Sequence, residues 1–215
     1  MTTLTRRAAL AAAAALPAAA ALGPRAALAA AEMKGTAMAP FARFALGGFE
    51  VTTLLSGTRT VENPNQIFGL NATPEEFAAA AEAAFIPTDK SQFFFTPTLV
   101  NTGTELVLFD AGLSPAGITA ALAAAGYEPG QVNRVVFTHF HGDHIGGLGG
   151  ATPTFPNATY VAGRVEFDHW AGAGNEGFEN NVRPLAERFS FIEDGAEAAP
   201  GVTAMATFGH APGHM

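Results

Sequence analysis

The sequence predicts an α/β fold that begins with antiparallel strands and continues with alternating strands and helices. Two observations lead to this prediction. Short apolar or β-branched runs bounded by turn residues indicate strands, and alanine-rich stretches that begin with capping residues indicate helices. Along the chain, strands joined by a tight turn come first, and a helix and a strand that enters a histidine-rich loop follow.

Three strands are expected in the first part of the domain. The run FEVTTLLS at 49–56 and the segments 96–100 and 105–109 have the composition and length of strands. Residues 101–104, Asn-Thr-Gly-Thr, are typical of a hairpin turn between the last two. We therefore expect these two strands to be antiparallel neighbours.

Two helices have clear start or stop signals. The first is predicted over residues 73–84, because Thr73 can cap the helix, Pro74 suits its first position and Glu76 lies three residues after the cap. The second is predicted over residues 115–125.

The strand that leads into the histidine-rich loop is expected at 132–138, where VNRVVFT is a short β-branched run typical of a buried strand. The remaining predicted elements are a short helix at 143–148, a strand at 159–161, a helix at 163–170 and a strand at 202–208.

Four potential metal ligands lie within six residues, at His139, His141, Asp143 and His144. Three imidazoles and a carboxylate this close together cannot share one face of a helix or strand, so they need a loop. Such a loop can turn His139 and His141 toward one cation and the other pair toward a second. Imidazole nitrogen and carboxylate oxygen without thiolate suit zinc, manganese, cobalt or iron. The motif therefore predicts half of a two-metal hydrolytic centre.

Two further histidines follow the last predicted strand, in the string HAPGH at 210–214. Proline and glycine mark a tight turn there, which can hold His214 as a third ligand with His210 behind it. Five of the six histidines fall in the two motifs, which favours a site over a histidine cluster that binds metal by accident. The sixth, His169, lies beside Trp170 in a predicted helix and is expected to be a pocket or surface residue.

Residues 1–31 have the parts of an export signal: a basic start, an alanine-rich apolar middle and small residues at the end. The pair Arg6 and Arg7 and the later Arg25 resemble a twin-arginine signal. A membrane anchor is the competing interpretation, but the apolar run is short and rich in alanine for that role. We therefore expect a periplasmic or secreted bacterial protein, exported by the twin-arginine machinery, with one domain at 32–215.

Composition restricts the partners. The net charge of −8 and pI near 5.1 disfavour nucleic acid and anionic membranes. The absence of cysteine excludes disulfides and thiolate ligands. The sequence also lacks a nucleophile elbow, which disfavours a Ser-His-Asp hydrolase. A small-molecule substrate is expected, and a homodimer is compatible with this composition.

The strings H-x-H-x-D-H at 139–144 and G-H-x-P-G-H at 209–214 resemble the metallo-β-lactamase superfamily. Further agreement lies in Leu99–Gly103, Phe109–Gly112, Ala125–Pro129 and Phe155–Ala158. Together with the leader, these segments resemble the branch that contains methyl parathion hydrolase and lactonase-like and esterase-like enzymes. The resemblance covers about residues 44–215. It implies an αββα sandwich with metals at one edge between its sheets.

The resemblance also implies roles for individual residues. Asp110 would support the histidine loop from behind, although an aspartate in a local turn at a strand end explains it equally well. His210 would take a similar supporting position, and Asp143 would be catalytic. Trp170 and Phe178 would wall an apolar substrate pocket. The implied metal ligands are His139, His141 and His214 for the first ion and Asp143 and His144 for the second.

Two divalent ions, zinc before manganese, cobalt or iron, are thus expected to activate water for attack on an ester, lactone or organophosphate. A mononuclear iron persulfide dioxygenase is the first alternative. A fragment that binds one metal or none is the second. This alternative arises because the family needs a metal-bridging aspartate and a last histidine after the second motif, whereas the chain ends at Met215. We therefore expect a sandwich that lacks its C-terminal part.

Overall fold

The computed structural model describes residues 32–33 and 39–215. The predicted export signal at 1–31 lies outside the described residues. Every described helix and strand belongs to one unit, Met38–Met215. Within the described residues, no helix has the length and apolar character needed to cross a membrane.

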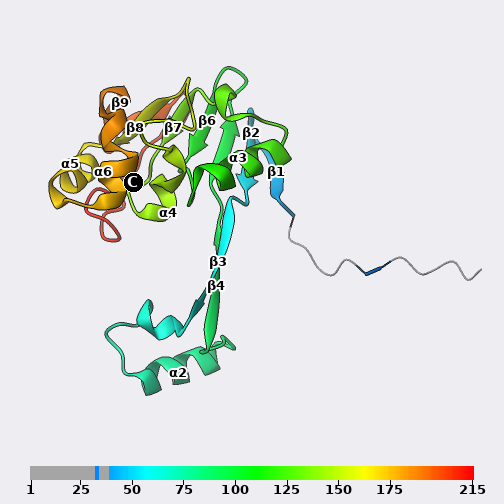
Figure 1. The fold of residues 1–215 in the computed structure, drawn as a ribbon, viewed down its shortest axis with the longest axis vertical. Coiled ribbons are helices and arrows are strands. Elements are labelled where there is room, and N and C mark those ends of the chain that lie inside the picture. Colours follow the sequence, from blue (N-terminus) through cyan, green and yellow to red (C-terminus); the bar gives the residue numbers. More distant parts are fainter. Residues whose placement is uncertain (1–31, 34–38) are drawn as a thin grey trace, which may run out of the picture. The chain divides into compact units, whose positions relative to one another are not determined.

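A seven-stranded mixed sheet forms the centre of this unit, in the order β1-β2-β5-β6-β7-β8-β9 (Figure 1). The pairs from β1 to β6 are antiparallel and those from β6 to β9 are parallel, as expected for an α/β fold with an antiparallel beginning. The strands are β1 (Phe41–Leu46), β2 (Phe49–Leu54), β5 (Thr98–Asn101), β6 (Leu106–Phe109), β7 (Arg134–Val136), β8 (Thr159–Gly163) and β9 (Phe189–Ile192).

Two small antiparallel sheets accompany the large one. β3 (Gly57–Glu62) pairs with β4 (Lys90–Phe95) in a long ribbon, and β10 (Glu197–Ala199) pairs with β11 (Val202–Thr203) (Figure 1). The chain between β3 and β4 contains η1 (Pro64–Gln66) and α2 (Pro74–Ala83). The other helices are α3 (Pro115–Ala124), η2 (Pro129–Gln131), α4 (Gly142–Ile145), η3 (Gly146–Leu148), α5 (Arg164–Ala173), α6 (Glu176–Asn181) and η4 (Arg183–Arg188).

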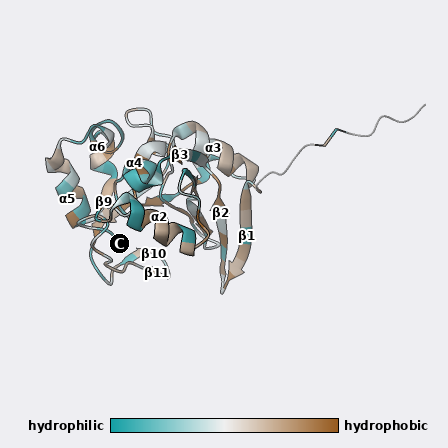
Figure 2. Ribbon diagram, turned by 90° about the horizontal axis from the view of Figure 1, so that it is seen from below, coloured by the Kyte–Doolittle hydropathy of each residue, from teal (hydrophilic) through white to brown (hydrophobic). Residues whose placement is uncertain are grey.

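Side chains of the sheet alternate between two apolar clusters, because successive residues of a strand point to opposite faces. On β6, Leu106 and Leu108 belong to the larger cluster and Val107 to the smaller. The larger cluster also contains buried residues of α3, α4 and α6, whereas the smaller contains residues of β10. Helices therefore cover one face of the sheet and β10 covers part of the other. In Figure 2, α4 has the hydrophilic colour and α3 a more apolar one.

Several predicted elements are confirmed. α2 has the predicted capping box, in which the Thr73 amide donates to Glu76 Oε2 at 2.8 Å and the Glu76 amide donates to Thr73 Oγ1 at 3.2 Å. The predicted hairpin is the β5–β6 pair. The strand predicted at 202–208 is wrong beyond Thr203, because the amides further along find partners outside a sheet: that of Ala206 donates to Asp194 Oδ1 at 2.8 Å and that of Thr207 to the carbonyl of His214 at 2.9 Å. Six further elements were not predicted from the sequence: β1, β3, β4, β9, β10 and α6.

Candidate metal centre

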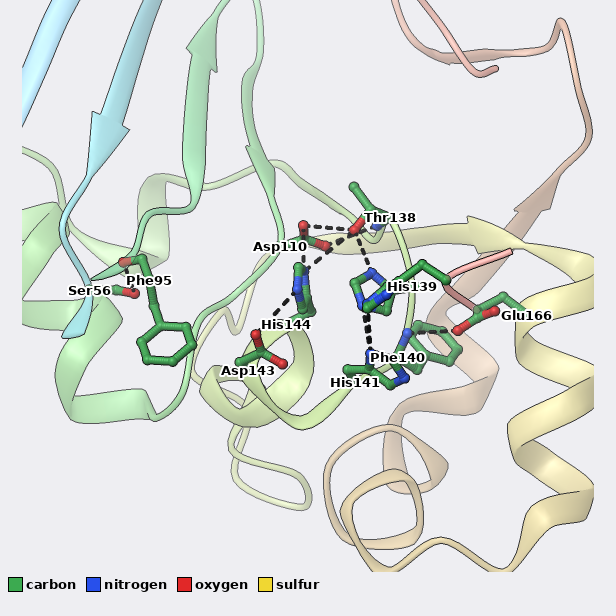
Figure 3. Close-up of polar contacts among 11 residues, drawn as sticks. Ser56, Phe95, Asp110, Thr138, His139, Phe140, His141, Asp143, His144 and Glu166 are labelled. Atoms are coloured by element: carbon green, nitrogen blue, oxygen red, sulfur yellow. Dashed lines mark hydrogen bonds and ion pairs between the residues drawn. The ribbon is translucent and has the colours of Figure 1, made fainter. Parts of the chain in front are cut away.

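The candidate site lies where three parallel strands end. Asp110 follows β6, the loop 138–144 follows β7, and Glu166 lies in the first turn of α5 after β8. The carboxyl ends of neighbouring parallel strands meet at one edge of a sheet, which is the usual place for a ligand site in an open α/β sheet. Figure 3 shows these side chains gathered at that edge.

Glycines allow the histidine loop to lie against the end of β6. A Cβ atom at Gly147 would lie 2.1 Å from the carbonyl oxygen of Ala111, and one at Gly146 would lie 2.3 Å from that of Leu113. The Ala111 amide donates to the carbonyl of His144 at 2.7 Å. The backbone after the histidine motif is therefore fixed directly to the segment after β6.

Three imidazoles converge, those of His139, His141 and His210. Nδ1 of His141 lies 3.0 Å from Nε2 of His139 and also 3.0 Å from Nε2 of His210. Because a ring nitrogen has either one proton or one lone pair, Nδ1 of His141 cannot form a full hydrogen bond with both. Two nitrogens bound to one tetrahedral zinc ion stand about 3.3 Å apart. The group, whose ligand atoms lie within 4.8 Å of one another, therefore fits a shared divalent cation.

The surroundings keep two of these imidazoles neutral. His139 is 2 % exposed, and burial followed by the neighbouring histidines lowers its pKa to about 3. Burial, assisted by His210 and opposed by Asp143, also lowers the pKa of His141. A metal binds only to the neutral form of imidazole, so both rings are ready to bind at neutral pH.

The third histidine of the group differs from the one we expected. His214 was expected as a ligand with His210 behind it, but the structure places His210 with the other two. Nδ1 of His214 lies 2.7 Å from Oγ1 of Thr207, and the ring centroids of His214 and His210 are 5.8 Å apart. The ring centroid of His214 is nevertheless 4.9 Å from that of His139, and the ring centroid of His210 is 4.8 Å from that of His139. Both rings flank the site, and the assignment of His214 as a ligand stays a prediction.

Asp143 and His144, the pair expected at a second ion, lie beside each other. Nε2 of His144 is 3.5 Å from Oδ2 of Asp143, and its Nδ1 is 2.8 Å from Oδ2 of Asp110. Burial lowers the pKa of His144, but the hydrogen bond and charge of Asp110, together with Asp143, outweigh it, and the pKa is raised. A carboxylate behind a histidine fixes the ring and leaves the other nitrogen for a metal. Asp110 thus lies where it can fix the His144 ring, and the supporting role that the resemblance implied stays a prediction.

Thr138 is a site residue that the sequence analysis missed. Its amide donates to Oδ1 of Asp110 at 2.9 Å and its hydroxyl donates to Oδ2 at 2.9 Å. The same hydroxyl lies 3.0 Å from Nδ1 of His139. Asp110 has a φ of 61°, a left-handed conformation that aspartate adopts more readily than most residues. The only signal in the sequence was the place of Thr138 between a strand and the first histidine.

The two residues predicted to wall a pocket have different surroundings. Trp170 is half-buried, and its ring centroid lies 5.6 Å from that of His141. Phe178 is fully buried and packs against Phe140 and Phe167. Its assignment to a pocket wall was wrong, because a side chain with no exposed surface belongs to the core. His169 is exposed on α5.

Two cavities adjoin the histidine loop, and Asp143 borders both. One, of about 320 Å³, also borders Asp110 and His144. The other, of about 390 Å³, has mostly apolar walls and one cationic side chain. Ser56 donates to the carbonyl of Phe95, a residue on the wall of both cavities, at 3.0 Å (Figure 3). The walls of the second cavity are Arg59, Val61, Ile67, Phe93, Phe95, Leu113, Gly142 and Asp143.

The sequence family agrees with this geometry. The model of the Metallo-beta-lactamase superfamily matches residues 96–215, a segment that contains both histidine motifs and more than half of the chain. This chain belongs to the metallo-beta-lactamase superfamily. The predicted family is confirmed, and the sheet-centred α/β architecture agrees with the fold class expected from it.

Curated relatives of this superfamily member include lactonases. The N-acyl homoserine lactonase of Bacillus thuringiensis is 32 % identical over 98 residues, which cover 46 % of this chain and 37 % of the relative. The N-acyl homoserine lactonase AttM of Azorhizobium caulinodans is 33 % identical over 110 residues, which cover 46 % of this chain and 40 % of the relative. The matched part of the chain thus spans less than half the length of these relatives.

Solved structures of the superfamily share the fold. The hydrolase AbOPH, of the beta lactamase superfamily, matches with a TM-score of 0.72 and 25 % identity over 83 % of this chain and 69 % of that chain. AidC, a dizinc quorum-quenching lactonase, matches with a TM-score of 0.71 and 21 % identity over 81 % of this chain and 68 % of that chain.

Proposed function

We propose that this protein is a metal-dependent hydrolase that opens lactones, with two divalent ions, zinc before others, as its cofactors. The observation that carries the proposal is the meeting of His139, His141 and His210 within 4.8 Å, beside the pair Asp143 and His144. The N-acyl homoserine lactonases among the relatives support a lactone as the substrate.

The residues divide between two positions. The group of His139, His141 and His210 would hold one ion, and Nε2 of His144 with the carboxylate of Asp143 would hold the other. Such ions lower the pKa of water and polarise a carbonyl or phosphoryl group. Asp143, which borders both cavities, lies where a substrate would meet the centre and is the carboxylate we expect to hold a proton there. Asp110 keeps Nε2 of His144 turned toward Asp143.

The apolar cavity supports a substrate with an apolar substituent. Phe93 stacks between Phe68 and Phe95, with ring centroids 5.7 and 6.4 Å away, and presents an aromatic surface next to Asp143. Burial of each methylene against such a wall contributes about 0.8 kcal/mol. Arg59, on the same wall, can donate to a carbonyl oxygen of the substrate. An acyl or aryl group on the lactone fits this surface.

Aryl esters and phosphotriesters are the second choice of substrate, because the same residues would serve attack on a carbonyl carbon or on phosphorus. The iron persulfide dioxygenase is disfavoured, since the relatives are lactonases and the structural neighbours include hydrolases.

A substrate comparison tests the proposal. The full chain, loaded with zinc, is assayed with an N-acyl homoserine lactone, an aryl ester and a phosphotriester, beside His139→Ala and the exposed control Asp168→Asn. Lactone turnover that a chelator and His139→Ala both abolish, and that Asp168→Asn retains, is the expected result. Zinc binding without turnover of any of the three substrates would contradict the hydrolase. Oxygen uptake with a persulfide by the iron-loaded chain would support the dioxygenase instead.

We also propose that the protein is exported to the periplasm or secreted by the twin-arginine route. The basis is the paired Arg6 and Arg7 ahead of an alanine-rich stretch. That route transports folded proteins, so a metal site could be filled before export.

A further inference from the structure

Glu166 has an unusual environment for an acidic residue. It is 1 % exposed, and among the described residues it is the one buried carboxylate. Burial of a charge is costly unless hydrogen bonds compensate it. The neighbours of this carboxylate therefore indicate why it is there.

Three N–H groups from three separate segments donate to Glu166. The amide of Phe140, between the first two histidines, donates to Oε1 at 2.9 Å, and the indole of Trp170 donates to the same oxygen at 2.6 Å. The amide of Gly213, next to His214, donates to Oε2 at 2.9 Å. Figure 3 shows the carboxylate beside the loop that carries His139 and His141. One side chain thus bonds to the backbone of both histidine motifs.

The second motif lies directly against the first turn of α5. A Cβ atom at Gly213 would lie 2.1 Å from the backbone nitrogen of Glu166, so no other residue fits without a shift of the backbone. The amide of Met215 donates to the carbonyl of Thr138 at 3.0 Å, which is a second link between the two motifs. The first link depends on the side chain of Glu166, whereas the second joins backbone atoms alone.

An apolar residue at position 166 would leave the amides of Phe140 and Gly213 without an acceptor in a buried place. An amide side chain would have one acceptor oxygen, and its NH₂ group would face an N–H donor. The full set of three bonds therefore requires a carboxylate.

We propose that Glu166 is a positioning residue of the metal centre, which ties the loop of the first histidine motif to the turn of the second and so sets the separation of their imidazoles. The proposal rests on the metal binding of the proposed function. Trp170 contributes to the same link, because its indole N–H and the Phe140 amide both donate to Oε1 of Glu166 and its ring lies against His141.

Metal binding by the full chain tests this role. Wild type, Glu166→Gln and the exposed control Glu187→Gln are compared for zinc affinity by chelator competition, for the absorption spectrum of bound cobalt(II), and for the unfolding midpoint in EDTA. We expect Glu166→Gln to weaken zinc binding about 10- to 100-fold, as for other residues that orient ligands. We also expect it to change the cobalt bands, which report ligand geometry. Glu187→Gln should match wild type.

Trp170→Phe keeps the test decisive if Glu166→Gln does not fold. It removes one bond to Oε1 and leaves both backbone bonds, so it should change the cobalt spectrum and weaken zinc binding less than the glutamine variant. Wild-type zinc affinity and cobalt spectrum in whichever of the two variants folds would overturn the proposal, and so would a loss of stability that is equal with and without zinc. If wild type binds no zinc, the proposed function fails as well; if wild type binds and the variants bind equally, only the role of Glu166 fails.

Discussion

Replacing Asp110 with asparagine should reveal how the aspartate supports His144. Asparagine keeps the volume and tolerates the φ of 61°. The side-chain oxygen of the asparagine can still accept from the Thr138 amide, and the Thr138 hydroxyl can accept from the asparagine NH₂ group instead of donating to the carboxylate. Only the bond from Nδ1 of His144, which is 2.8 Å long in the wild type, is therefore lost. A hydrogen bond to a charged group contributes about 1.5–3 kcal/mol to the free energy of unfolding. We expect a loss of that size in the metal-free protein at acid pH.

The pH dependence of this loss has a definite sign. Because the pKa of His144 is raised in the folded protein, its contribution is fully present below the ordinary pKa of histidine and is lost as the pH rises through the folded value. Urea unfolding in EDTA at about pH 5.5 and 8.5, on either side of that ordinary value, should therefore give a larger difference between wild type and Asp110→Asn at the lower pH. The exposed control Asp168→Asn should change stability by less than about 0.5 kcal/mol. An equal difference at both of these pH values, or a larger one at the higher pH, would show that Asp110 does not stabilise the charged form of His144.

Three further predictions follow from the structure and sequence. Phe93→Ala should raise KM for a long-chain acyl lactone at least several-fold, because loss of the aromatic wall removes burial worth about 0.8 kcal/mol per methylene. KM for a short-chain lactone should stay nearly unchanged, and equal effects on both substrates would exclude this wall from the substrate site. Because the pKa of His139 falls to about 3 on folding, metal-free stability should decrease as the pH drops from 6.5 toward 3, and a shallower decrease in urea unfolding of His139→Gln checks this. Replacing Arg6 and Arg7 by lysine should leave the protein in the cytoplasm when cell fractions are probed, and unchanged export would argue against the twin-arginine route.

Elements with strong local signals could be predicted from the sequence. α2 has a capping box, and β6 and β7 are short apolar runs buried in the sheet. β1 and β3 were missed because they are largely exposed, so burial imposes no apolar alternation on them. Strands of this kind are defined by their partners across the sheet, which a local pattern does not contain.

The residues of the candidate site also differ in whether a local sequence signal identifies them. The ligands of the first motif could be named because they are adjacent in the sequence. The approach of His210 to His141, 69 residues away, depends on how the turn after β11 packs, and the sequence favoured His214 instead. Glu166 lies in the first turn of a helix, where acidic residues are common because they suit the helix dipole. Its buried bonds to both motifs arise only from the tertiary structure.

Zinc titration into the metal-free full chain tests whether the converging histidines form a metal centre. Wild type is compared with His139→Ala, His210→Ala and His214→Ala by calorimetry. We predict that wild type binds zinc and that His139→Ala and His210→Ala each weaken the binding by more than the 10- to 100-fold, roughly, that is expected for a supporting residue. The result for His214→Ala then tells whether that ring is a ligand as well. Zinc binding by the His139→Ala and His210→Ala variants with wild-type affinity would contradict the assignment of the converging histidines as a metal centre.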